Sequence, residues 1–104
     1  MARDPLVLAQ VKAVLEEITQ IAPGKSVELR VPPFAAVQCV AGPKHTRGTP
    51  PNVVEMSADV LFALIDGSTT WADALYAGDI SASGERSDLS DLFAKAAATI
   101  RIAE

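Results

Sequence analysis

The first predicted helix is marked by apolar residues that recur every three or four positions between residues 5 and 22. Asp4 is a typical N-cap, Pro5 suits the first helical position, and Pro23-Gly24 predicts the end of the helix. Polar residues occupy the other faces, so we expect one stripe to lie across a sheet. That stripe consists of Val7, Val11, Val14, Leu15, Ile18, Ile21 and Ala22.

The next segments have the two-residue period of strands. In residues 27–31 apolar and polar side chains alternate, and Pro32-Pro33 then removes two backbone N–H donors, so the strand ends there or becomes an edge. Residues 36–40 and 52–56 predict two more strands. The glycine- and proline-rich residues 41–51 between them predict a surface loop.

Two short helices and a strand are predicted between Ser57 and Gly84. Ser57 is an N-cap for a helix that Gly67 ends, and Leu61, Leu64 and Ile65 form its apolar stripe. Thr70, followed three residues later by Asp73, resembles a capping box that opens a second helix ending at Gly78. Its apolar face is predicted to carry Trp71, Ala74 and Leu75, and residues 80–84 then alternate as a strand does.

A last helix, capped by Ser87 or Asp88, follows this strand. The elements together predict an α+β fold, in which a mostly antiparallel sheet of four or five strands carries the helices on one face. The pattern does not give the strand order. The apolar face of the last helix is predicted to consist of Leu89, Leu92, Phe93, Ala96 and Ala97.

The order helix, turn, helix, strand in this central segment resembles the signature of the sterol carrier family. Its leucine-rich helix ending in glycine corresponds to Leu61–Gly67, its second helix to Ala74–Gly78, and the end of its strand to Gly84-Glu85. Residues 30–34 and 48–55 look like the short bacterial branch of the family, so the resemblance covers most of the chain. It implies a non-catalytic carrier with an apolar pocket for a fatty-acyl or sterol-like lipid.

Such a pocket would be lined by the large apolar residues of the central segment and its neighbours. The alternative is that these side chains simply fill the core of a short chain. Trp71 and Tyr76 carry polar atoms and are the expected rim residues. The candidate ligand-binding residues are Phe34, Leu61, Leu64, Trp71, Leu75 and Phe93.

A basic cluster in the predicted loop is a candidate site for an anionic headgroup. Lys44, His45 and Arg47 stand close together there in an otherwise acidic chain. If they bind an acidic lipid, binding should strengthen as the pH falls through about 6 to 7, where histidine gains its charge. The alternative is a solvated loop with no role in binding.

Length and charge narrow the class of protein. The 104 residues predict one domain over residues 1–104, and nine basic against thirteen acidic side chains give a charge of −4, which disfavours a nucleic-acid partner. No run approaches the ~20 apolar residues of a membrane span. One cysteine, Cys39, forms no internal disulfide, and the amphipathic first segment is no signal core, so we expect a cytoplasmic protein in which Cys39 is a small buried side chain.

No motif in the sequence indicates catalysis. There is no G-x-S-x-G, no phosphate-binding glycine loop and no dinucleotide fingerprint. One histidine and one cysteine do not make a structural metal site. We therefore expect no enzymatic activity, no metal and no cofactor.

A second hypothesis keeps the same fold but closes the cavity, so that the protein is an interaction module or a homodimer. Apolar residues near the termini, most of which lie outside the clean stripes, motivate it. Sedimentation at several concentrations separates the two, since a lipid-binding monomer favours the carrier. The residues concerned are Leu6, Val7, Leu8 and Ile102.

Overall fold

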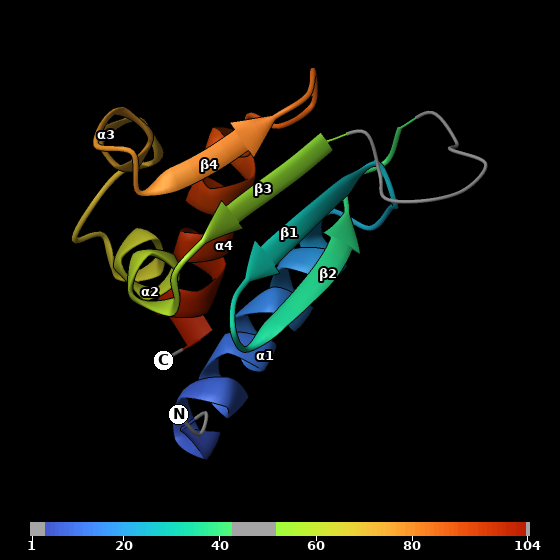
Figure 1. The fold of residues 1–104 in the computed structure, drawn as a ribbon. Coiled ribbons are helices and arrows are strands. Elements are labelled where there is room, and N and C mark those ends of the chain that lie inside the picture. The colour runs from blue at the N-terminus through green and yellow to red at the C-terminus, as the bar shows by residue number, and fades with distance from the viewer. Residues whose placement is uncertain (1–3, 43–51, 104) are drawn as a thin grey trace.

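The computed structural model describes residues 4–42 and 52–103, which form helices packed on one sheet (Figure 1). No helix in these ranges is long and apolar enough to cross a bilayer. In chain order the elements are α1 (Pro5–Ile21), β1 (Val27–Val31), β2 (Ala35–Cys39), β3 (Asn52–Met56), α2 (Ala58–Asp66), α3 (Trp71–Tyr76), β4 (Ile80–Ser83) and α4 (Ser90–Ala103).

The predicted helix ends are confirmed for the first three helices. Asp4, Ser57 and Thr70 are the N-caps of α1, α2 and α3, and each side chain accepts a hydrogen bond from a backbone N–H of the first turn. Gly67 and Gly78 follow α2 and α3 with φ angles of 84° and 82°, a region that glycine enters at little cost. Local chemistry therefore sets where these helices begin and end.

The four-stranded sheet is mixed, so the prediction of a mostly antiparallel sheet was wrong. Its order is β2-β1-β3-β4, and β1 pairs antiparallel with β2 but parallel with β3. The β1–β2 hairpin returns the chain to the end of the sheet where β1 begins. Since β3 starts at that end on the other side of β1, it must run in the same direction as β1. β4 then pairs antiparallel with β3.

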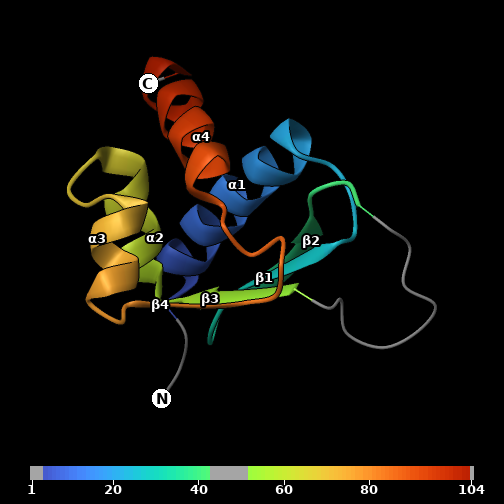
Figure 2. The same cartoon turned by 90° about the horizontal axis from the view of Figure 1, so that it is seen from above.

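All four helices lie on one side of the sheet, as Figure 2 shows. Val27, Leu29 and Val31 of the central strand β1 are fully buried beneath them. The strand residues that point to the other face are mostly polar or small: Glu28, Arg30, Ala36, Gln38, Val53, Glu55, Ser81 and Ser83. The hydrophobic core is therefore a single layer between the sheet and the helices.

A buried polar side chain joins three segments that are distant in sequence. Asn52, the first residue of β3, is 4% exposed. Its Nδ2 donates to the carbonyl oxygen of Ser26 at 2.7 Å, and its Oδ1 accepts from the backbone N–H of Arg86 at 2.9 Å. Asn52 thus ties the start of β3 to the residue before β1 and to the loop after β4.

Cys39 is fully buried at the end of β2, as predicted. Burial disfavours the thiolate and raises the pKa of this thiol to about 11. We expect an aromatic disulfide reagent at pH 8 to label Cys39 only as fast as the protein opens, and to label it at once in urea. Rapid labelling of the native protein would contradict this placement of the thiol.

Candidate functional site

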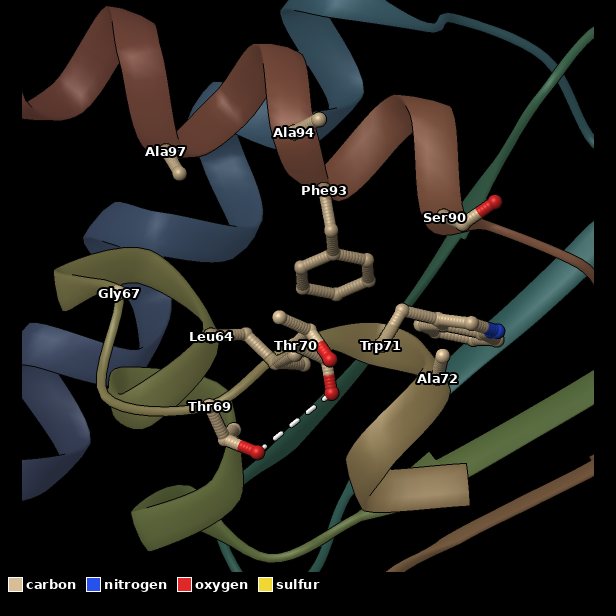
Figure 3. Close-up of a pocket in the computed structure, with 10 residues that line it drawn as sticks. All are labelled: Leu64, Gly67, Thr69, Thr70, Trp71, Ala72, Ser90, Phe93, Ala94 and Ala97. Atoms are coloured by element: carbon tan, nitrogen blue, oxygen red, sulfur yellow. Dashed lines mark hydrogen bonds between the residues drawn. The ribbon is translucent and has the colours of Figure 1, made fainter. Parts of the chain in front are cut away.

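A groove of about 430 Å³ lies between α2, α3 and α4 on the helical side of the molecule (Figure 3). It is open to solvent. The described residues that line it are Leu64, Gly67, Thr69, Thr70, Trp71, Ala72, Ser90, Phe93, Ala94 and Ala97.

The turn between α2 and α3 forms one wall of the groove. Gly67 ends α2 in a left-handed conformation, and the chain then reaches Thr70, whose Oγ1 accepts from the backbone N–H of Asp73 at 3.1 Å. This cap makes Trp71 the first residue of α3. The indole is therefore positioned by two local signals, a helix stop and a helix start.

One face of α4 forms the opposite wall. Ser90, Phe93, Ala94 and Ala97 are spaced so that they share a helical face, and three of these four side chains are small. Neither Ser90 nor Ala94 was predicted from the sequence to have a role in binding. The signal that was available is a set of small residues at helical spacing around Phe93, which leaves room beside a large ring.

The rings of Trp71 and Phe93 meet between the two walls. Their centroids are 5.7 Å apart and their planes are inclined by 30°, an offset stacked arrangement that stabilises aromatic pairs. Trp71 is 8% exposed and Phe93 is 2% exposed, so both rings belong to the packed core and also line the groove. Core packing therefore positions both rings.

A second hollow, of about 450 Å³, adjoins the groove and shares part of its lining. Trp71, Ala72 and Ser90 line both, so the indole lies between the two spaces. The remaining described residues of the second hollow are Leu75, Ala82, Ser87 and Asp88.

The structure brings four of the six candidate ligand-binding residues to these two spaces. Leu64, Trp71 and Phe93 line the groove, and Leu75 lines the second hollow. Leu61 is fully buried in the core and lines neither space. Phe34, partly buried against the core after β1, also lines neither.

Of two other predictions made from the sequence, one was wrong and one concerns residues outside the described ranges. Leu75 was expected to share the covered face of α3 with Trp71 and Ala74, but it is 43% exposed, so that expectation was wrong. The basic cluster Lys44, His45 and Arg47 lies outside the described residues, and its role as a headgroup site stays a prediction.

The groove suits an apolar guest. None of the described residues that line it is charged, and its side-chain polar groups are the hydroxyls of Thr69, Thr70 and Ser90 and the indole N–H of Trp71. In the second hollow Asp88 accepts a hydrogen bond from the backbone N–H of Ser90 at 3.0 Å. This bond, together with one from the Ser90 side chain, lowers the pKa of Asp88, so the carboxylate is ionised at neutral pH.

No cluster of three or more histidine, cysteine, aspartate or glutamate side chains within residues 4–42 and 52–103 is arranged to hold a metal ion. A thiol or an imidazole is also absent from the described lining of the groove. The arrangement offers apolar contact and hydroxyl hydrogen bonds.

Comparison with known proteins gives one family and one fold. The family model described as "Bacterial SCP ortholog" matches residues 3–94. Among solved structures, a chain described as "UbiJ-SCP2 Ubiquinone synthesis protein" superposes with a TM-score of 0.54 at 19% sequence identity, and the match covers 97% of each chain. A search of the curated proteins finds no match. At this identity the structural likeness shows the fold alone.

Proposed function

The chain belongs to the family of bacterial SCP orthologs, and on that premise we propose that it is a non-catalytic protein that binds a hydrophobic small molecule in the groove between α2, α3 and α4. The observation that carries the proposal is the uncharged lining of this groove around the stacked rings of Trp71 and Phe93. The ligand class is a fatty-acyl or sterol-like lipid.

The size and chemistry of the groove support this ligand class. Its volume of about 430 Å³ falls within the ~300–1,000 Å³ typical of small-molecule sites. Burial of apolar ligand surface stabilises a complex by roughly 25 cal/mol per Å², and a lining without charges imposes no desolvation penalty on ionised groups. The apolar part of the lipid is placed against Trp71 and Phe93, and its polar end is placed toward solvent near the hydroxyls.

The hydroxyls of the groove support a binding role rather than catalysis. Thr70 Oγ1 accepts the capping hydrogen bond from Asp73, and the Ser90 side chain is hydrogen-bonded to Asp88. An activated nucleophile needs a neighbouring base such as histidine, and no histidine is among the described residues that line the groove. The solved neighbour is described as a ubiquinone synthesis protein, and this description is compatible with a hydrophobic ligand on the same fold.

Energy transfer from Trp71 to a fluorescent fatty acid tests the proposal directly, because Trp71 is the single tryptophan of the chain and lines the groove. We expect a saturable decrease in tryptophan emission at micromolar ligand. The absence of a saturable change with both the fatty acid and a fluorescent sterol would contradict the proposal.

A matched pair of α4 variants locates the binding site. Ala94 and Ala98 are both exposed on α4, but only Ala94 is among the residues that line the groove. Ala94→Gln places an uncharged, bulky polar side chain there, and we expect a loss of affinity of at least about tenfold, equivalent to ~1.4 kcal/mol. Ala98→Gln should change the affinity less than about twofold. Equal effects of the two substitutions would place the ligand elsewhere.

A further inference from the structure

An exposed apolar stripe runs along the outer face of α3. Ala72, Leu75 and Tyr76 are spaced three and four residues apart, so they share one face of this short helix. Tyr76 is 96% exposed and Leu75 is 43% exposed. The other large hydrophobic side chain that is exposed within the described residues is Leu6 on α1, at 68%.

The stripe is continuous with the second hollow. Ala72 and Leu75 belong to the stripe and also line the hollow of about 450 Å³. Isolated exposed apolar residues are ordinary, whereas a Tyr and a Leu side by side at the edge of a concave apolar space are typical of interaction sites. An entering side chain can therefore contact Leu75 and Trp71 from the hollow while its neighbours cover Tyr76.

The chain around α3 is acidic, and the first basic side chain that follows it in the sequence is Arg86. From Ser57 to Glu85 the sequence holds Asp59, Asp66, Asp73, Asp79 and Glu85 but no lysine, arginine or histidine. Because the whole chain has a charge of −4, this segment of −5 carries more negative charge than the entire protein does. The negative charge is therefore concentrated in the segment that contains the stripe.

Three carboxylates are near the stripe, two of them close to it in the sequence and the third in the hollow. Asp73 lies within α3 and Asp79 follows it, and both are exposed. Asp88 lines the second hollow beside Leu75. We define the α3 surface as Ala72, Leu75 and Tyr76, the hollow, and the rim of these three aspartates.

We propose that the α3 surface docks a basic amphipathic segment of a partner protein, whose apolar side chains cover Tyr76 and enter the hollow while its lysines or arginines face Asp73, Asp79 and Asp88. This role goes beyond the lipid groove and does not depend on it.

Charge complementarity selects this occupant. An anionic bilayer is repelled by a segment with five acidic and no basic side chains. A second copy of the chain would bring the same acidic rim against itself in a two-fold contact, since such a contact joins identical patches. A basic amphipathic segment can cover the apolar stripe and at the same time place its basic side chains against the acidic rim.

The test uses two labelled helical peptides of about 14 residues, one built from leucine and lysine and the other from leucine and glutamate, with the same apolar stripe. The fluorescence anisotropy of the labelled lysine peptide should rise to saturation as the full chain is added. This binding should weaken at about 0.5 M salt, because screening shortens the range of charge attraction. The glutamate peptide should not bind. Equal binding of both peptides would overturn the proposal.

Exposed residues supply variants that keep the fold. We expect Leu75→Ser combined with Tyr76→Ser to weaken lysine-peptide binding at least about tenfold, and Asp73→Lys combined with Asp79→Lys to shift the preference toward the glutamate peptide. The matched controls on α1 are Leu6→Ser and Glu16→Lys, both at exposed positions. A control that weakens binding as much as the α3 variants would overturn the assignment of the surface.

Two further measurements distinguish the other occupants. If the wild-type protein sediments with zwitterionic phosphatidylcholine vesicles and the Tyr76→Ser variant does not, the occupant is a lipid surface. That result would overturn the proposal. Self-association that Tyr76→Ser abolishes would identify a second copy of the chain and would overturn it equally. The expected result is a monomer that ignores such vesicles and binds the lysine peptide.

Discussion

Replacing Leu61 with alanine is expected to lower the free energy of unfolding by about 2–5 kcal/mol, whereas the same substitution at Leu75 should cost less than about 1 kcal/mol. Leu61 is 0% exposed within the core and Leu75 is 43% exposed on α3. The first change leaves a cavity among packed neighbours, and the second removes contacts that are partly made with water. The chemical change is identical, so the difference measures burial.

Urea denaturation followed by Trp71 emission measures both variants against the wild type. Similar losses for the two variants would show that the burial difference between Leu61 and Leu75 does not hold in solution. The folded Leu61→Ala protein should still quench with the fluorescent fatty acid, because Leu61 does not line the groove. Loss of ligand binding in a folded Leu61→Ala protein would extend the binding site into the core.

Replacing Asn52 with leucine is expected to destabilise the protein by about 1–3 kcal/mol, the usual cost of an unsatisfied buried polar group, because this change removes the partner of one buried group and of one partly buried group. These are the carbonyl oxygen of Ser26 and the backbone N–H of Arg86, which Asn52 joins at 2.7 and 2.9 Å. Leucine has a similar volume, so lost packing contributes little. A loss of stability below about 0.5 kcal/mol, the usual range of surface substitutions, would show that these two hydrogen bonds contribute little to stability.

The Asn52→Asp variant separates the two hydrogen bonds through pH. Its carboxyl can still accept from the backbone N–H of Arg86, but it can donate to the Ser26 carbonyl only when it is protonated. The folded protein should therefore raise the pKa of this aspartate above its unfolded value of about 3.9. Stability relative to the wild type is greatest below that value and is lost as the pH rises through the folded pKa. Thermal unfolding from pH 3 to 7 measures this dependence, and a flat difference from the wild type would contradict it.

Residues of the candidate site could be predicted from the sequence only where they are also large apolar residues on a helix face. Leu64, Trp71 and Phe93 were identified as large apolar residues on helix faces, and they line the groove. Leu61 has the same signal but points into the core. Ala94 is an ordinary helix residue in the sequence, and it lines the groove because α2 and α3 form the other side of that space. A groove is defined by the space between elements, which no single periodicity describes.

The short helix α3 shows why its faces were misjudged. Residues 74 and 75 lie three and four positions after Trp71, so a pattern of six residues does not separate the covered face from the exposed one. Packing of α3 against α4 and β4 decides it, and buries Ala74 while exposing Leu75. The α3 surface is thus a product of tertiary structure, although its acidic rim is plain in the sequence.

The sequence by itself determined the local structure of this protein. Helix starts at Asp4, Ser57 and Thr70 and stops at Gly67 and Gly78 depend on hydrogen bonds and backbone angles within a few residues, so neighbouring positions carry the information.

Only the tertiary structure decided the parallel pairing of β1 with β3, the groove and the tie at Asn52. It also gave Gly24 a second role beyond ending α1, because a Cβ there would lie 2.2 Å from the carbonyl oxygen of Val40. Each of these features joins segments more than ten residues apart. The free energy of such contacts depends on which elements meet, and the local pattern of apolar and polar residues does not specify that.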